Sequence, residues 1–227
     1  MSTARARLAA QLLADSRLPS GAYAHSAGLE AAQQAGAGVD AVRGYMSARL
    51  ATTARTDAAA AALALRTARI GIGSTGLGRI DRAVAARTPS EPMRAASRQL
   101  GRGLLRIGAR LADGDALVAE LAGRRVPPMR PVALGAVGSA LGLDETEVAS
   151  ITCYEEAQSI ASAALKLYPI DPATAATWVL DCADEIEVAV TAAVDVAHPD
   201  ALPAWSAPFS EIWLQTHSQE RRRLFVS

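Results

Sequence analysis

Apolar residues recur along most of the chain at intervals of three and four, the spacing of an amphipathic helix. Stretches of this kind are separated by short segments that contain Gly, Pro, Ser or Asp. The section 58–65 is apolar on every side, which indicates a helix buried on most of its surface. The pattern predicts helices over residues 4–15, 28–35, 41–70, 79–86, 89–109, 113–123, 131–141, 145–167 and 172–196.

Several predicted helices carry start signals in the residues before them. Asp40 precedes the helix 41–70, and Asp171-Pro172 combines a capping side chain with a proline in the first turn. Thr88–Glu91 and Asp144–Glu147 have the form of capping boxes, in which two side chains satisfy each other's backbone N–H groups. These signals place the helix boundaries independently of the apolar pattern.

Composition supports the same fold class. The chain has 227 residues, of which 52 are Ala and only nine are aromatic. Ala is the best helix former, and sheets favour the β-branched and aromatic residues that are scarce here. We therefore expect an all-α multi-helix bundle forming a single helical domain over residues 1–207. The prolines near the end predict an extended C-terminal tail over 208–227.

Charge and cysteine content restrict the function further. The 23 basic and 23 acidic residues give zero formal net charge, which argues against nucleic acid as a partner. No apolar run reaches the ~18 residues of a membrane helix, and the N-terminus does not have the pattern of a signal peptide. Cys153 and Cys182 lie far apart and form no C-x-x-C motif. The sequence predicts a soluble cytoplasmic protein.

Gly71-Ile-Gly73-Ser-Thr-Gly76 matches the G-x-G-x-x-G fingerprint of dinucleotide-binding sites. That motif works only between a strand and a helix, whose N-terminus meets the pyrophosphate. Here the preceding segment is helical in pattern, and no βαβ unit is present. We therefore expect residues 71–78 to be a mobile and dispensable interhelical loop.

Other candidate chemistry is sparse. His25, His198 and His217 are too far apart in sequence for helical ligand spacing, so we expect no metal site. Glu155 and Glu156 are adjacent on a predicted helix and point about 100° apart, which favours a solvated face over an acid/base pair. The sequence predicts no catalytic residue and no cofactor.

Two segments have features that a helical core does not require. Residues 18–30 are rich in small residues with Tyr23 and His25 interleaved, which permits close backbone approach and anchoring contacts. A structural turn between helices explains this segment equally well on these grounds alone. Residues 208–227 combine large apolar side chains with the run Arg221–Arg223, which suits docking onto another surface.

Together these segments resemble the urease accessory protein UreF family, whose N-terminal signature has the form L-P-x-G-[AG]-[FY]-x-[HY]-S-x-G-L-E. The signature is matched in order by Leu18, Pro19, Gly21, Ala22, Tyr23, His25, Ser26, Gly28, Leu29 and Glu30. The chain end resembles the family's closing pattern P-x-x-x-I, a histidine, then R-L-F-x-S. That pattern is matched by Pro208, Ile212, His217, Arg223, Leu224, Phe225 and Ser227.

A weaker resemblance covers the middle of the chain, where Glu91–Arg94 and Gln99–Arg102 are similar to the family's E-x-R and Q-x-G-R helix. The chain departs from the family at Ser218, where a glutamate is usual. It also departs at Pro169–Pro172, which replaces a P-L-G-Q turn. Because Asp171-Pro172 is a strong helix start, we expect the fold to survive this change.

The resemblance implies a function in nickel-enzyme maturation. Proteins of this family bind the accessory protein UreD, also called UreH, and the nickel-carrying GTPase UreG, and the complex activates apo-urease. The family also forms homodimers. By this resemblance the chain is a non-catalytic scaffold whose partner-binding residues are Pro19, Gly21, Tyr23, His25, Ser26, Gly28, Glu30, His217, Arg223, Leu224 and Phe225.

Two other functions stay open on the sequence. A GTPase-activating protein would insert an arginine or a glutamine into the nucleotide site of UreG, and the many arginines provide candidates without marking one. A stand-alone enzyme would use the glycine-rich segment 71–78 as a nucleotide site. GTP turnover by UreG with and without the chain tests the first alternative, and nucleotide binding by the isolated chain tests the second.

Overall fold

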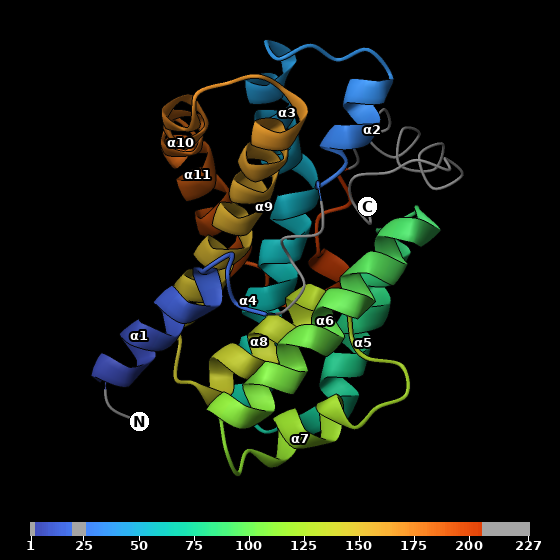
Figure 1. The fold of residues 1–227 in the computed structure, drawn as a ribbon. Helices are drawn as coiled ribbons and strands as arrows, with labels where there is room; N and C mark the ends of the chain where they lie inside the picture. The colour runs from blue at the N-terminus through green and yellow to red at the C-terminus, as the bar shows by residue number, and fades with distance from the viewer. Residues whose placement is uncertain (1–2, 20–25, 206–227) are drawn as a thin grey trace.

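The computed structural model describes residues 3–19 and 26–205, and every regular element within these ranges is helical (Figure 1). The predicted all-α bundle is therefore confirmed, whereas the predicted tail 208–227 lies outside the described residues. The elements are α1 (Thr3–Ala14), α2 (Leu29–Gln34), α3 (Ala41–Arg49), the π-helix η2 (Leu50–Ala54), α4 (Arg55–Arg69), α5 (Gly73–Ala86), α6 (Glu91–Leu111), α7 (Ala116–Ala122), α8 (Arg130–Ala140), α9 (Glu145–Leu167), α10 (Pro172–Leu180), α11 (Ala183–Val194) and the 3₁₀ turn η3 (Pro199–Ala201).

Helix α4 runs through the middle of the bundle, with α5, α8, α9 and α11 packed around it (Figure 1). Residues 58–65 of α4 are all buried, as the apolar pattern predicts. The closest approach is to α8 at Gly135, where an added Cβ would lie 2.4 Å from the carbonyl oxygen of Ala61 and 2.6 Å from the Cβ of Ala64. Small side chains on both helices therefore permit the tight contact at the centre of the core.

The predicted helix 41–70 is continuous in its path but is divided by the π-helical turn η2. Arg49, at the end of α3, and Asp57, in the first turn of α4, flank this π-helical turn and both line one cavity, described below. Asp40 stands at the N-cap position, but its side chain makes no capping hydrogen bond. The predicted role of Asp40 as a cap is therefore wrong, since its backbone is already in the helical region.

Two other caps have the predicted geometry. Asp144 Oδ1 accepts from Glu147 N at 2.8 Å, and Glu147 Oε2 accepts from Asp144 N at 2.8 Å, which completes the capping box of α9. Asp171 Oδ1 accepts from Ala173 N at 2.7 Å at the start of α10. Helix α10 therefore begins where Asp171-Pro172 predicts, although the UreF-like pattern has a P-L-G-Q turn at this place.

Two predicted starts are displaced. Helix α6 begins at Glu91 with Ser90 at its N-cap, because the Thr88 hydroxyl donates to Val84 O at 3.0 Å and so belongs to the end of α5. Helix α7 is capped by Asp115, whose Oδ1 accepts from Val118 N at 2.9 Å, and not by Asp113. Asp115 therefore replaces Asp113 as the cap of α7, whereas the Ser90 side chain makes no capping hydrogen bond at the start of α6.

The predicted helix 172–196 is in fact two helices, α10 and α11, which meet at Asp181 and Cys182. Arg43 Nη2 donates to Asp181 O at 2.8 Å, so a side chain from α3 takes a carbonyl that a continuous helix would use internally. The buried Cys182 thiol donates to Trp178 O at 3.2 Å. A long-range contact thus stabilises a break that no glycine or proline marks.

The expectation of a loop over 71–78 is wrong, because α5 begins at Gly73 and includes Gly76 and Gly78. The interruption after α4 is confined to residues 70–72. Leu77, Ile80 and Val84 are buried at helical spacing, and burying this face outweighs the cost of about 1 kcal/mol for each glycine in a helix. The G-x-G-x-x-G match is therefore part of a packed helix start.

Candidate functional site

A cavity of about 160 Å³ lies between several helices and has five charged side chains in its wall. Its walls come from residues 27–28 before α2, from α3, η2 and α4, from α6, from the start of α8 and from α9. Met93, Leu100 and Met129 form apolar parts of the wall, whereas the opposing helices contribute charged and hydroxyl groups. The cavity is thus amphipathic and is built by segments far apart in the sequence.

Two arginines and three carboxylates line this cavity, and we call them the charged cluster: Arg49, Asp57, Arg130, Glu155 and Glu156. Arg49 Nε donates to Glu156 Oε1 at 2.5 Å, and Arg130 Nη2 donates to Glu155 Oε1. The Arg49 side chain is only 5 % exposed, and its Nη1 has no hydrogen-bond partner among the described residues. The cluster therefore retains one buried donor that a guest molecule or water could use.

Glu155 and Glu156 do not form the solvated face that their position in the sequence favours. Their side chains are 20 % and 19 % exposed, and each forms an ion pair with a different arginine. The prediction is wrong because α9 is surrounded by other helices, so that both neighbouring positions point toward the cavity wall. Burial of a carboxylate requires such pairing.

Two carboxyls of the charged cluster, Asp57 and Glu155, hold protons more tightly than isolated carboxyls do. Burial raises the pKa of Asp57 to about 7, with the negative charge of Glu156 acting in the same direction and Arg49 and Arg130 opposing it. Burial also raises the pKa of Glu155 to about 7, against the lowering effect of Arg130. The cavity therefore contains carboxyl groups that titrate near neutral pH.

The arrangement provides polar binding groups without an activated nucleophile. Burial raises the pKa of the nearby Cys153 thiol to about 12, which keeps it protonated and unreactive. Over residues 3–19 and 26–205, no three His, Cys, Asp or Glu side chains are close enough to hold a metal ion. In the same ranges, no helix combines the length and apolarity needed to cross a membrane.

Four residues of the predicted partner-binding set lie in the described N-terminal region. Ser26 and Glu30 are buried at 0 % and 3 % exposure, and Gly28 has φ of 86° at the N-cap of α2 and lines the cavity. Pro19 is exposed, and its carbonyl oxygen accepts from Arg106 Nη2 at 3.4 Å. The second half of the signature is therefore anchored in the bundle next to the cavity, and its binding role stays a prediction.

The remaining members of the set lie outside the described residues: Gly21, Tyr23, His25, His217, Arg223, Leu224 and Phe225. The second described range ends at Trp205, which is 63 % exposed and lies with Thr56 and Arg87 around a small pocket that shares Asp57 with the cavity. Thr56 Oγ1 donates to Pro203 O at 3.1 Å, and Arg87 Nε donates to Leu202 O at 2.9 Å. The chain is thus tied to α4 and α5 just before the predicted tail.

Sequence reasoning missed Arg49, Asp57 and Arg130 as functional candidates. These residues come from three separate helices, and no local spacing brings them together. One signal was available at Asp57, which directly precedes the stretch 58–65 that is apolar on all sides. A carboxylate at that place has to be buried and has to find a partner.

Comparison with known proteins agrees with this architecture. The sequence model of the UreF family matches residues 36–183, a range that contains the whole charged cluster. The chain belongs to the UreF family.

Curated UreF relatives match almost the whole chain. The proteins named "Urease accessory protein UreF" from Mycobacterium sp. (strain JLS) and Mycobacterium marinum (strain ATCC BAA-535 / M) are each 34% identical, over 217 and 220 residues. The protein of that name from Mycolicibacterium vanbaalenii is 35% identical over 224 residues. Each alignment covers 95% of this chain and 96% of the relative, so the UreF likeness extends over nearly the whole length of both proteins.

Proposed function

We propose that this chain is a urease accessory protein that acts in assembly of the nickel centre of urease. The observation that carries the proposal is the similarity to proteins named "Urease accessory protein UreF", at 34% identity over 95% of the chain. Within the cytoplasm, the chain serves as a scaffold and chaperone without catalytic residues. It binds a UreD (UreH)-like protein and a UreG-like GTPase and couples GTP hydrolysis to activation of apo-urease.

The partner-binding regions in this proposal are the N-terminal signature and the C-terminal tail. Burial of Ser26 and Glu30 supports a firm attachment of the signature to the bundle, which a docking segment needs. Contacts of Thr56 and Arg87 with residues 202–203 support a fixed point of departure for the tail. We also propose that the chain forms a homodimer, in which each copy presents these two segments.

Co-purification tests the proposal directly. A tagged UreD-like protein expressed with this chain and a UreG-like GTPase is expected to retain both in a complex that survives gel filtration. GTP turnover by the complex, compared with that of the GTPase alone, tests the alternative that the chain is a GTPase-activating protein. If neither accessory protein retains the chain, the proposed function is wrong.

A further inference from the structure

Helix α6 carries an arginine at every fourth position from residue 94 to residue 110: Arg94, Arg98, Arg102, Arg106 and Arg110. A spacing of four places successive side chains on one face of a helix, about 6 Å apart along its axis. The helix has a single acidic residue, Glu91, in its first turn. Like charges at this spacing destabilise a helix unless contacts of each arginine offset this repulsion.

The first two arginines have structural partners. Arg98 Nη1 forms an ion pair with Asp81 Oδ2 at 3.0 Å and donates to Pro127 O at 2.7 Å, which ties α6 to α5 and to the segment before α8. Arg94 Nη1 donates to the carbonyl oxygens of Thr88 and Pro89 at 2.6 and 2.7 Å. Packing within the chain accounts for these two positions.

The other three, which we call the arginine row, are exposed: Arg102, Arg106 and Arg110. Arg102 Nη2 donates to Arg125 O at 2.8 Å and Arg106 Nη2 to Pro19 O at 3.4 Å, contacts that orient the guanidinium groups without neutralising them. Among the described residues, no carboxylate forms an ion pair with any of the three. The basic charge of this face is therefore uncompensated within the described chain.

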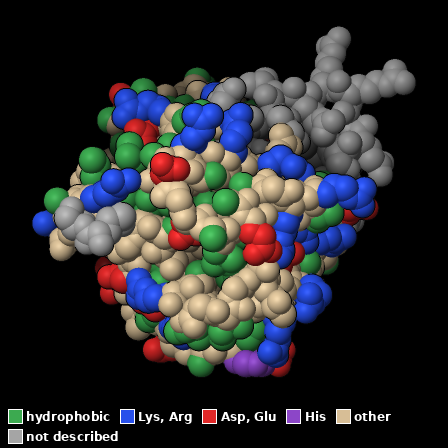
Figure 2. Space-filling model, turned by 90° about the horizontal axis from the view of Figure 1, so that it is seen from below, with side chains coloured by type: hydrophobic (Ala, Val, Ile, Leu, Met, Phe, Trp, Pro, Cys, Tyr) green, Lys and Arg blue, Asp and Glu red, His purple; other side chains and the backbone are tan. Residues whose placement is uncertain are grey.

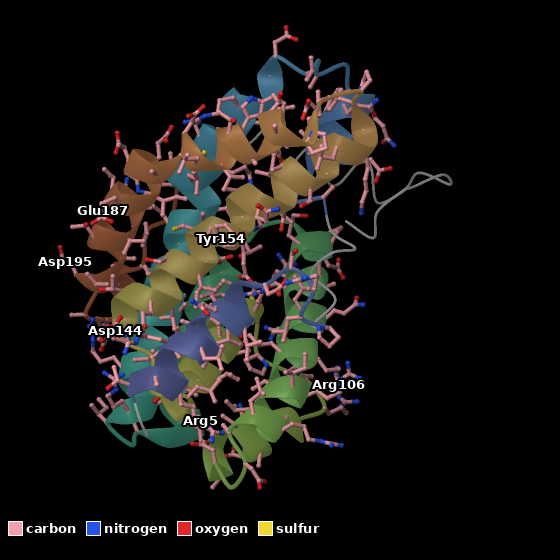
Figure 3. The ribbon with its side chains drawn as sticks, turned by 60° about the vertical axis from the view of Figure 1, so that its left-hand side comes forward. Arg5, Arg106, Asp144, Tyr154, Glu187 and Asp195 are labelled. Carbon is pink, nitrogen blue, oxygen red and sulfur yellow. The ribbon has the colours of Figure 1, made fainter. Side chains whose placement is uncertain are left out.

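The arginine row does not reflect a generally basic protein. The chain has zero net charge, and no Lys or Arg occurs between Lys166 and Arg221. On α11 the exposed side chains include Asp184 and Glu187. Figure 3 shows Arg106 projecting from one side of the molecule and Glu187 projecting from the opposite side. The arginine row and these acidic side chains of α11 therefore lie on opposite sides of the molecule.

We propose that the arginine row is a docking surface for an acidic segment of a partner protein. Guanidinium forks bind carboxylates in a bidentate manner, and carboxylates four residues apart on a partner helix repeat at the same interval of about 6 Å. The sequence of α6 contains no aromatic residue on which a nucleic-acid base could stack, and the zero net charge of the chain gives no general attraction to a long polyanion. Charge complementarity therefore favours a protein partner.

A binding experiment with a defined probe tests this surface independently of the urease partners. The probe is a fluorescent helical peptide as long as α6 with Glu at every fourth position, and the same peptide with Gln is its control. Anisotropy titrations compare the full chain with the variants R106Q/R110Q, R106K/R110K and R79Q/R82Q. The last pair removes two exposed arginines of α5 and so matches the change in net charge.

R106Q/R110Q is expected to bind the Glu peptide about tenfold more weakly, since two exposed ion pairs together contribute up to a factor of that size. R79Q/R82Q is expected to bind like the unaltered chain, R106K/R110K to lie between them, and the Gln peptide not to bind. Equal weakening in R106Q/R110Q and R79Q/R82Q would show only a general charge effect and would overturn the proposal. If a single-stranded RNA binds the full chain more tightly than the Glu peptide does, and R106Q/R110Q abolishes that binding, the arginine row binds nucleic acid and the proposal is wrong.

Discussion

The charged cluster around Asp57 explains how a carboxylate can exist beside the all-apolar stretch of α4. Two arginines and three carboxylates face one another there, so the cluster carries one excess negative charge when every group is ionised. Uptake of one proton makes it neutral, which is the favoured state in a buried environment. The pKa values of Asp57 and Glu155 are each raised to about 7, so either carboxyl can take up this proton near neutral pH.

Asp57→Asn is expected to reduce the pH dependence of stability. The pKa of Asp57 is raised in the folded protein, so the folded state holds a proton near pH 6 that the unfolded chain has already released. This contribution to stability is present at acidic pH and is lost as the pH rises through about 7. Between pH 6 and 8 the unaltered protein should lose about 1 kcal/mol more than the Asn variant does, as measured by urea unfolding.

Asp184→Asn is the matched control for this measurement. It removes the same charge from the exposed face of α11, away from the cavity, and is expected to leave the pH dependence unchanged. The groups that face Asp57 are Arg49, Arg130, Glu155 and Glu156, and all of them are retained in both variants. Parallel pH profiles for Asp57→Asn and the unaltered protein would show that Asp57 is ionised throughout.

At the residue scale, the sequence predicts local contacts well and distant ones poorly. The caps at Asp144 and Asp171 are predictable because donor and acceptor lie two or three residues apart. The pair Arg49–Glu156 joins positions 107 residues apart, and its existence depends on how α3 and α9 pack. The solvated interpretation of Glu155 and Glu156 failed for this reason.

At the scale of elements, the bundle depends on small residues where helices cross. Ala-rich α4 meets α8 at Gly135, and α6 meets the segment before α8 at Gly101, where an added Cβ would lie 2.2 Å from Pro128 O. Backbone atoms cannot move away as a flexible side chain can. These two glycines are needed for close approach, although both lie within helices, where glycine is otherwise unfavourable.

Gly135→Ala is expected to destabilise the protein by about 1–3 kcal/mol, because the new methyl group overlaps the backbone of α4. Gly44→Ala is the control, since Gly44 lies in α3 with no atom within 4 Å of an added Cβ. That change should be neutral or stabilise by up to about 1 kcal/mol. Thermal or urea unfolding of both variants measures the difference, and equal stabilities would contradict the packing described at the α4–α8 crossing.

Element boundaries differ from the sequence patterns where tertiary contacts outweigh local preference. The glycines of 71–78 are helical because Leu77 and Ile80 bury one face of α5. The helix 172–196 is broken because Arg43 binds the carbonyl of Asp181. Neither outcome is visible in a short window of sequence, whereas α6, α8 and α9 lie within two residues of the bounds that the apolar period predicts.

At the scale of the whole molecule, acidic, basic and apolar side chains are intermixed over the face seen in Figure 2, and Arg106 and Glu187 project from opposite sides in Figure 3. The arginine row and the anchoring of residues 202–203 lie outside the cavity walls. We propose that these two separate surfaces around one core serve partners. This organisation agrees with the proposed role as a scaffold.

Deleting residues 218–227 is expected to abolish capture by a UreD-like partner while leaving the bundle folded. The deleted segment contains Arg223, Leu224 and Phe225, which the proposal assigns to partner binding, and it contains no residue of the described core. Far-UV circular dichroism should show unchanged helicity, with a melting temperature close to that of the full chain. If the UreD-like partner captures the shortened chain normally, residues 218–227 are not part of the partner-binding surface.

The central claim, that this chain acts in nickel-dependent maturation of urease, is tested most directly by reconstitution. Purified apo-urease is incubated with nickel, GTP, a UreD-like protein and a UreG-like GTPase, with and without this chain, and urease activity is then measured. We expect strong activation only when the chain is present, and none from the chain and nickel alone. Equal activation in its absence would contradict the claim.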